Sequence, residues 1–190
     1  MNPKRLKTIS KYLSKHLRHT PDAIGLALAP GGWVEVEALL AACKANQFAI
    51  ERAELDRVVA TSDKQRFAFD ASQTRIRANQ GHSVPVDLQL EPQVPPDRLY
   101  HGTGAGSVAS IVESGLDKRK RHHVHLSADR ETAVKVGSRH GRPVVFAVDA
   151  AAMVAAGFMF WRSQNGVWLA DRVPPQYLQR LDAIDGQNAI

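Results

Sequence analysis

The two halves of this sequence meet in one segment, Arg75-Ile76-Arg77-Ala78-Asn79-Gln80-Gly81-His82-Ser83. Its first residues alternate, so Ile76 and Ala78 point to one side of a strand and Arg75 and Arg77 to the other. The alternation then gives way to polar residues, among them a glycine and a histidine. Because an arginine pair precedes these polar residues, we interpret the segment as a phosphate-binding junction between two lobes.

The residues before this junction predict three helices and a β-hairpin. Apolar residues recur at helical spacing within 4–19, 35–45 and 50–60. A turn at Pro30-Gly31-Gly32 precedes a short extended piece at Trp33-Val34, and 66–70 alternates in the same way as 74–78. This order is the pattern of a winged helix, a fold that often contacts nucleic acid, although the fold alone does not define a function.

The first helix has two different faces. Its apolar stripe consists of Leu6, Ile9, Tyr12, Leu13 and Leu17. The other face carries Lys4, Lys7, Lys11, Lys15 and Arg18. Pro21 ends the helix, so Arg18 and His19 are expected in its last turn, where the helix dipole favours cations.

A proline-rich stretch, 85–97, predicts an extended linker between a domain at 1–84 and a domain at 98–190. The second domain is expected to mix strands and helices, which makes the whole chain α+β. Strands are expected at 99–103, 123–127, 143–149, 158–161 and 167–169. One helix should stop at Gly115 and another should begin after Asp129 and end near Gly141. Asn165-Gly166 is a strong turn signal between the last two strands.

Charge and composition restrict the class of protein. The net charge of the 190 residues is +6. A second basic run, Lys118-Arg119-Lys120-Arg121, adds to the basic first helix, and such patches favour polyanions. No run of about 18 apolar residues predicts a membrane span. Without a secretory signal, and with Cys43 as a single cysteine, we expect a buried helical thiol in the reducing cytoplasm.

Three groups of residues could carry chemistry. The glycine-rich run His101-Gly102-Thr103-Gly104-Ala105-Gly106 is either a flexible turn or a strand end whose backbone approaches a planar ligand. The histidines 122, 123 and 125 lack a second ligand cluster for a metal, so they are either pocket residues or exposed. The dispersed cations are either a phosphate clamp or surface ion pairs, and they are Arg18, His19, Arg77 and Arg139.

Six motifs in order make the sequence similar to the NAD-dependent RNA 2'-phosphotransferase family, also called tRNA 2'-phosphotransferase. They are Leu17-Arg18-His19, 76–83, His101-Gly102-Thr103, 123–127, 137–141 and 166–169. The resemblance extends from about residue 4 to residue 181. It implies an N-terminal winged-helix lobe for RNA and a C-terminal ADP-ribosyltransferase-like lobe for NAD.

The resemblance also implies the site residues. The catalytic set would be Arg18, His19, Arg77 and Arg139. The NAD-binding residues would be His101, Gly102, Thr103, His125, Leu126, Ser127 and Val167. The RNA-binding residues would be Lys11, Lys15, Arg75, His82 and Ser83, and no metal is implied. Many relatives that modify proteins carry glutamate where this chain has Val167. A phosphate monoester is already an anion near pH 7, so it needs positioning rather than deprotonation.

The implied reaction has two steps with NAD as co-substrate. An internal 2'-phosphate of RNA, as tRNA splicing leaves it, attacks the ribose of NAD, releases nicotinamide and forms a 2'-phospho-ADP-ribosylated RNA. The ribose 2″-hydroxyl then attacks phosphorus, which frees the RNA and forms ADP-ribose 1″,2″-cyclic phosphate. Two alternatives stay open: an ADP-ribosyltransferase that caps terminal nucleic-acid phosphates, and a non-enzymatic winged-helix regulator with an NAD-sensing lobe. We expect a cytoplasmic monomer.

Overall fold

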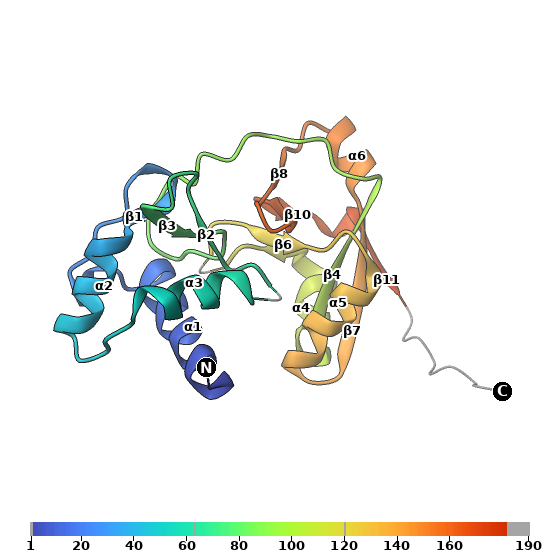
Figure 1. Cartoon of the computed structure of the whole chain (residues 1–190). Coiled ribbons are helices and arrows are strands. Elements are labelled where there is room, and N and C mark those ends of the chain that lie inside the picture. The colour runs from blue at the N-terminus through green and yellow to red at the C-terminus, as the bar shows by residue number, and fades with distance from the viewer. Residues whose placement is uncertain (1, 63, 120, 182–190) are drawn as a thin grey trace. The chain divides into compact units, whose positions relative to one another are not determined.

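The computed structural model describes residues 2–62, 64–119 and 121–181 (Figure 1). The chain divides into two compact units, Met1–Leu90 and Glu91–Ile190, and each has its own hydrophobic core. Both units combine helices with small antiparallel sheets, which confirms the predicted α+β class. The winged-helix and ADP-ribosyltransferase-like assignments, and the boundaries 1–84, 85–97 and 98–190, stay predictions. Lys120 and the end of the predicted second domain, 182–190, lie outside the described residues.

In its described residues, the first unit contains three α-helices, two short 3-10 helices and a three-stranded sheet. Its α-helices and strands are α1 (Pro3–Arg18), β1 (Trp33–Glu35), α2 (Val36–Ala45), α3 (Arg52–Ala60), β2 (Phe67–Phe69) and β3 (Arg75–Ala78). The predicted helices and hairpin are therefore confirmed, although α1 ends at Arg18 and His19 is its C-cap. The extended piece at Trp33 becomes a true strand, because β1 pairs with β3 to give the order β1-β3-β2.

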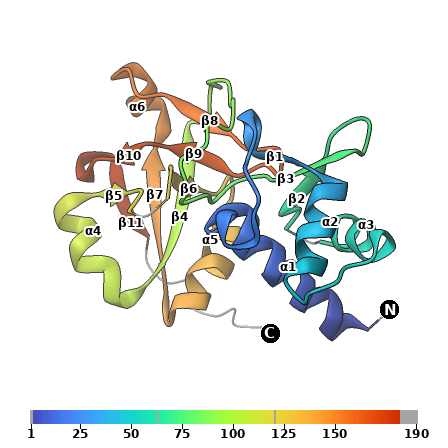
Figure 2. The ribbon, with the colours of Figure 1, turned by 90° about the vertical axis from the view of Figure 1, so that its left-hand side faces the viewer.

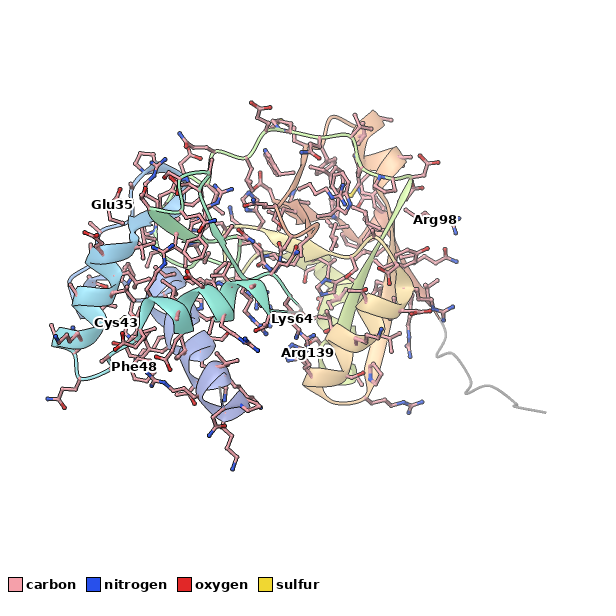
Figure 3. All side chains as sticks on the ribbon, viewed as in Figure 1. Glu35, Cys43, Phe48, Lys64, Arg98 and Arg139 are labelled. Carbon is pink, nitrogen blue, oxygen red and sulfur yellow. The ribbon has the colours of Figure 1, made fainter. Side chains whose placement is uncertain are left out.

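The apolar stripe of α1 packs into the core of the first unit. Ile9, Leu13 and Leu17 are fully buried, as the spacing predicted. The helix begins where Asn2 Oδ1 accepts a hydrogen bond from Lys4 N at 2.9 Å, with proline in the first turn. Cys43 is buried in the same core on a helix, which confirms the predicted buried helical thiol (Figure 3). This burial raises the pKa of the thiol to about 11.

Strand β3 has the predicted alternation. Ile76 and Ala78 are fully buried, whereas Arg75 is exposed and Arg77 is half-buried. The register places Trp33 opposite Arg77 on one side and Ala68 opposite Arg77 on the other. The two arginines therefore share the outer face of the sheet with Trp33.

The second unit is built around two three-stranded sheets, β11-β7-β4 and β6-β9-β8, and a short β10-β5 pair. Its helices are α4 (Val108–Ser114), α5 (Arg130–Gly137) and α6 (Ala150–Ala155). Its strands are β4 (Arg98–Gly104), β5 (Leu116–Asp117), β6 (Val124–Leu126), β7 (Pro143–Asp149), β8 (Phe160–Arg162), β9 (Trp168–Ala170), β10 (Arg172–Val173) and β11 (Leu178–Leu181). The sequence did not predict α6, β5, β10 or β11. Figure 2 shows α4 and α5 on the two sides of the sheet that contains β4 and β7.

Gly102 and Gly104 of β4 allow close packing against the strand, which neither the flexible-turn nor the ligand-approach interpretation predicted. The strand continues through Gly104, so the interpretation of Gly102 as part of a flexible turn is wrong. A Cβ atom at Gly102 would lie 1.7 Å from Ala133 O, and one at Gly104 would lie 2.2 Å from His140 O. The missing side chains let the backbone of α5 and of the turn after it lie directly against the strand.

The ends of α4 and α5 follow the predicted signals. Gly115 terminates α4 in a left-handed φ of 81°. Asp129 Oδ1 accepts a hydrogen bond from Thr132 N at 2.7 Å and caps α5. Helix α5 ends at Gly137, and a short 3-10 helix, Ser138–His140, leads to Gly141.

Residues of the predicted linker are attached to the two units by hydrogen bonds and packing. On the first-unit side, Gly31 N donates to Asp87 O at 2.8 Å, and Leu88 is buried. On the second-unit side, Gln93 N donates to Phe160 O at 2.8 Å. Among the described helices, none is both long and apolar enough to cross a membrane.

Candidate active site

Arg18 is held at the end of α1 by the hairpin of the first unit. Its Nη2 donates to Arg66 O at 3.3 Å, and its guanidinium carbon lies 5.9 Å from the centroid of the Phe67 ring. The backbone of Ser83 returns to the same helix end, where Ser83 N donates to Arg18 O at 2.9 Å. The segment after β3 is therefore joined to the last turn of α1.

His19 lies next to this connection. Its Nδ1 is 2.9 Å from Ser83 Oγ, and its backbone N–H donates to Lys15 O at 2.9 Å. The structure thus brings together two predicted catalytic residues, Arg18 and His19, and one predicted RNA-binding residue, Ser83. Lys11 and Lys15 are exposed on α1.

Arg77 is held by residues that the sequence interpretation missed. Its guanidinium carbon lies 4.5 Å from the centroid of the Trp33 ring, and Nη1 donates to Gly31 O at 3.3 Å. Burial lowers the pKa of Arg77, but an arginine remains a cation at neutral pH. Only the pairing of β1 with β3 brings Trp33 to this arginine, so a motif search could not have found it.

Arg75 stabilises the turn of the hairpin. Its Nε lies 3.0 Å from Asp70 Oδ2, and its backbone N–H donates to Asp70 Oδ1 at 3.0 Å. These hydrogen bonds, led by the backbone one, lower the pKa of Asp70 to about 2. The ring of His82 is fully buried beside Gly32. The RNA contacts expected of Arg75 and His82 stay predictions.

In the second unit, β4 and the end of β6 place two predicted NAD-binding histidines side by side. Tyr100 and Ser127 exchange backbone hydrogen bonds of 2.9 and 2.7 Å. Next to them, His101 Nδ1 donates to His125 O at 3.0 Å. Because a carbonyl oxygen only accepts, the proton of neutral His101 is on Nδ1 and Nε2 is an acceptor. Burial lowers the pKa of His101, and the nearby Arg121 and Arg119 lower it further.

Val167, another predicted NAD-binding residue, lies directly before β9. The register of β6 and β9 pairs Leu126 with Trp168, and Val167 directly precedes this pair. The predicted Asn165-Gly166 turn is confirmed, with Gly166 at a φ of 79°. Val167 N donates to Ser163 Oγ at 3.1 Å, which fixes the end of the turn. The side chain of His125 is also held, because Arg121 Nη1 donates to its Nδ1 at 3.2 Å.

Arg139 is in the second unit, on the short 3-10 helix after α5, and it is exposed (Figure 3). Thr103 and Leu126 are buried. A hollow of about 520 Å³ lies in the same unit, and Val108, Val134, Val145 and Leu181 are among the residues that line it. None of the predicted site residues lines this hollow. Among the described residues, no cluster of His, Cys, Asp and Glu could hold a metal ion.

Fold and site together define an α+β protein with two parts. One unit holds two arginines and a histidine around a hairpin, and the other places two histidines on adjacent strands. The chain belongs to the RNA 2'-phosphotransferase, Tpt1 / KptA family, whose model matches residues 4–172. The family resemblance of the sequence motifs is therefore confirmed.

Curated proteins similar to this chain come from several bacteria. A "Probable RNA 2'-phosphotransferase" of Nostoc punctiforme is 67% identical over 95% of this chain and 100% of its own length. A protein of the same name from Trichormus variabilis is 62% identical over 96% of this chain and 100% of its own length. A third, from Streptomyces griseus, is 56% identical over 94% of this chain and 98% of its own length.

Proposed function

We propose that this protein is an NAD-dependent RNA 2'-phosphotransferase. It transfers the 2'-phosphate of RNA to NAD and releases nicotinamide and ADP-ribose 1″,2″-cyclic phosphate. The observation that carries this proposal is the placement of Arg18, His19 and Arg77 around one hairpin in a chain of this family. The relatives named above support the reaction class through their names.

In this proposal the first unit binds the RNA phosphate. Each arginine presents a planar fork of N–H donors that suits phosphate oxygens. The ring and carbonyl contacts of Arg18 and Arg77 limit the rotamers of both side chains before substrate binds. Such preorganisation stabilises charge on the phosphate without a reorganisation cost during the reaction.

The second unit is suited to bind NAD. His101 keeps Nε2 as a hydrogen-bond acceptor, which matches a hydroxyl donor such as those of a ribose. Its lowered pKa keeps the ring neutral near pH 7, so it does not add a positive charge beside the cationic nicotinamide. Val167 carries no carboxylate, which agrees with an acceptor that is already ionised.

The proposed reaction balances in two steps. A 2'-phosphate oxygen forms a bond to the ribose carbon of NAD, and the bond to nicotinamide breaks with its electron pair going to the neutral leaving group. The ribose 2″-hydroxyl then attacks phosphorus, the bond to the RNA 2'-oxygen breaks, and the hydroxyl proton is transferred to that oxygen. The arginines stabilise the charge on the phosphate oxygens in both steps.

The test is to incubate the purified protein with a 2'-phosphorylated oligonucleotide and NAD, without added metal. We expect release of nicotinamide and of RNA with a free 2'-hydroxyl. Arg18→Ala and Arg77→Ala should each lower kcat/KM by about a hundredfold or more. Arg52→Ala is the matched control, because Arg52 pairs with Asp56 at 2.8 Å on the exposed face of α3.

Two results would contradict the proposal. If the wild-type protein produces neither nicotinamide nor dephosphorylated RNA, the proposed reaction is wrong. If an oligonucleotide that also carries a terminal phosphate keeps its 2'-phosphate and accumulates a stable ADP-ribosylated end, the protein performs only a capping transfer.

A further inference from the structure

We infer that Asn79 is a positioning residue for Arg18 and acts through the chain segment Gln65–Phe67. The inference rests on the proposed function, in which Arg18 binds the RNA 2'-phosphate. Asn79 directly follows β3, and its side chain is buried, with only 5% of the residue exposed. Asn79 would act on the reaction indirectly, because its hydrogen bonds go to Gln65 and Arg66, next to the contacts of Arg18.

Arg18 and Asn79 share one backbone acceptor. Arg66 O accepts a hydrogen bond from Arg18 Nη2 at 3.3 Å and another from Asn79 N at 2.9 Å. The next residue, Phe67, supplies the ring near the Arg18 guanidinium. Arg66 and Phe67 therefore supply two of the contacts that orient the guanidinium of Arg18.

The side chain of Asn79 fixes the residue before this acceptor. Its Nδ2 donates to Gln65 O at 2.6 Å. Gln65 has a φ of 40°, in the left-handed region, which an L residue other than glycine adopts only at an energetic cost. Such a conformation persists where the surrounding structure holds it. The amide of Asn79 supplies one of these restraints, from a position that is distant along the chain.

The amide oxygen of Asn79 indicates that the side chain positions Arg18 rather than stabilises the fold. The nitrogen must face Gln65 O, because a carbonyl only accepts, so the orientation of the amide is determined. Asn79 Oδ1 is then buried, with no hydrogen-bond partner among the residues that the structure describes. A buried oxygen without a partner destabilises the folded state, so the side chain is poorly suited to a purely stabilising role.

The experiment compares Asn79→Ala with the wild-type protein in the oligonucleotide assay. We expect kcat/KM to fall by about tenfold to a hundredfold, the range for a displaced catalytic group. The matched control is Asn46→Ala, which removes an exposed hydrogen bond of 2.9 Å from Asn46 Nδ2 to Ala42 O on α2. This control should change kcat/KM by less than about twofold.

A double-mutant cycle distinguishes an effect of Asn79 on the position of Arg18 from a general loss of structure. If Asn79 acts through Arg18, adding Asn79→Ala to Arg18→Ala should lower kcat/KM by less than about twofold further. Binding gives a second readout. Asn79→Ala should reduce the preference for a 2'-phosphorylated over an unphosphorylated oligonucleotide, with affinity for the unphosphorylated one unchanged.

Several outcomes would overturn the inference. If Asn79→Ala has wild-type activity while Arg18→Ala is defective, the inference about Asn79 is wrong and the proposed function stands. The same holds if Asn79→Ala lowers kcat/KM by the same factor in the wild-type protein and in Arg18→Ala. Failure of Asn79→Ala and Asn79→Ser to fold, judged by circular dichroism, would also overturn it, because the amide would then be needed for the fold itself. An Arg18→Ala variant with wild-type activity would instead reject the proposed role of Arg18, and this inference with it.

Discussion

Charged side chains at the candidate site differ in what holds them. Arg18 and Arg77 each combine a backbone carbonyl with an aromatic ring, whereas Arg75 pairs with the carboxylate of Asp70. A carbonyl and a ring orient a guanidinium without cancelling its charge. A carboxylate neutralises it. The ion pair with Asp70 therefore suits Arg75 to a structural role in the hairpin turn.

His101 makes the stability of the protein depend on pH. Burial lowers its pKa below 6.5, so under acidic conditions the unfolded chain binds a proton that the folded chain does not bind. Stability should therefore be fully present above about pH 6.5 and decrease as the pH falls below it, by at most about 1.4 kcal/mol per pH unit for one proton. The pKa of His123 is also lowered, mainly by burial, and contributes in the same direction.

The measurement is the thermal unfolding midpoint between about pH 7.5 and about pH 5. His101→Gln retains a donor for His125 O and should flatten the dependence on pH. His101→Gln/His123→Gln should flatten it further. The control is Lys44→Gln, which changes an exposed side chain of the first unit and leaves every histidine in place. Identical pH profiles for the wild-type protein and both histidine variants would contradict this account.

At the scale of elements, the contact between β4 and α5 organises the second unit. Two glycines allow it, Gly102 and Gly137, because a Cβ at Gly137 of α5 would have the backbone of Thr103 within 3.1 Å. The same strand carries His101, so the packing of α5 and the position of a predicted NAD-binding residue depend on one backbone. Close packing leaves little room to accommodate an added methyl group.

Gly102→Ala should therefore destabilise the second unit strongly. The new Cβ would overlap Ala133 O, and overpacking of this kind costs about 3 kcal/mol or more. Gly106→Ala is the control, because no atom lies within 4 Å of its added Cβ. Thermal unfolding followed by circular dichroism should show a midpoint several degrees lower for Gly102→Ala. Equal midpoints for the two variants would mean that α5 is not held against β4 as described.

At the scale of the whole molecule, the net charge of +6 favours a polyanionic substrate. The lysines of α1 are exposed and lie on the helix that ends at Arg18. They can attract RNA independently of its sequence, while the phosphate preference would come from the arginines. Affinity for RNA and selection of the 2'-phosphate are then separable properties.

Salt dependence tests this division. Lys11→Gln/Lys15→Gln should reduce the slope of log affinity against log salt by about 0.7 per lysine for single-stranded RNA. The preference for a 2'-phosphorylated oligonucleotide should stay unchanged. Lys44→Gln is the control, since Lys44 is an exposed lysine of α2. A wild-type slope in the double variant would remove Lys11 and Lys15 from the RNA-binding surface.

The amino-acid sequence by itself determined the local elements and the family. Helical spacing in α1, alternation in β3, the Asp129 cap and the Asn165-Gly166 turn are all confirmed, because each depends on neighbours within a few residues. The ordered motifs were sufficient for the family, since each one keeps its residue types in a continuous stretch.

Only the tertiary structure decided which residues contact the side chains of the candidate site. Trp33 meets Arg77 through the β1–β3 register, Asn79 reaches Gln65 across a loop, and Gly102 faces the backbone of α5. Periodicity reports which face of an element is apolar, but it contains no information about which distant element covers that face. These contacts join residues far apart in the chain, so they are set by strand pairing and packing rather than by any local pattern.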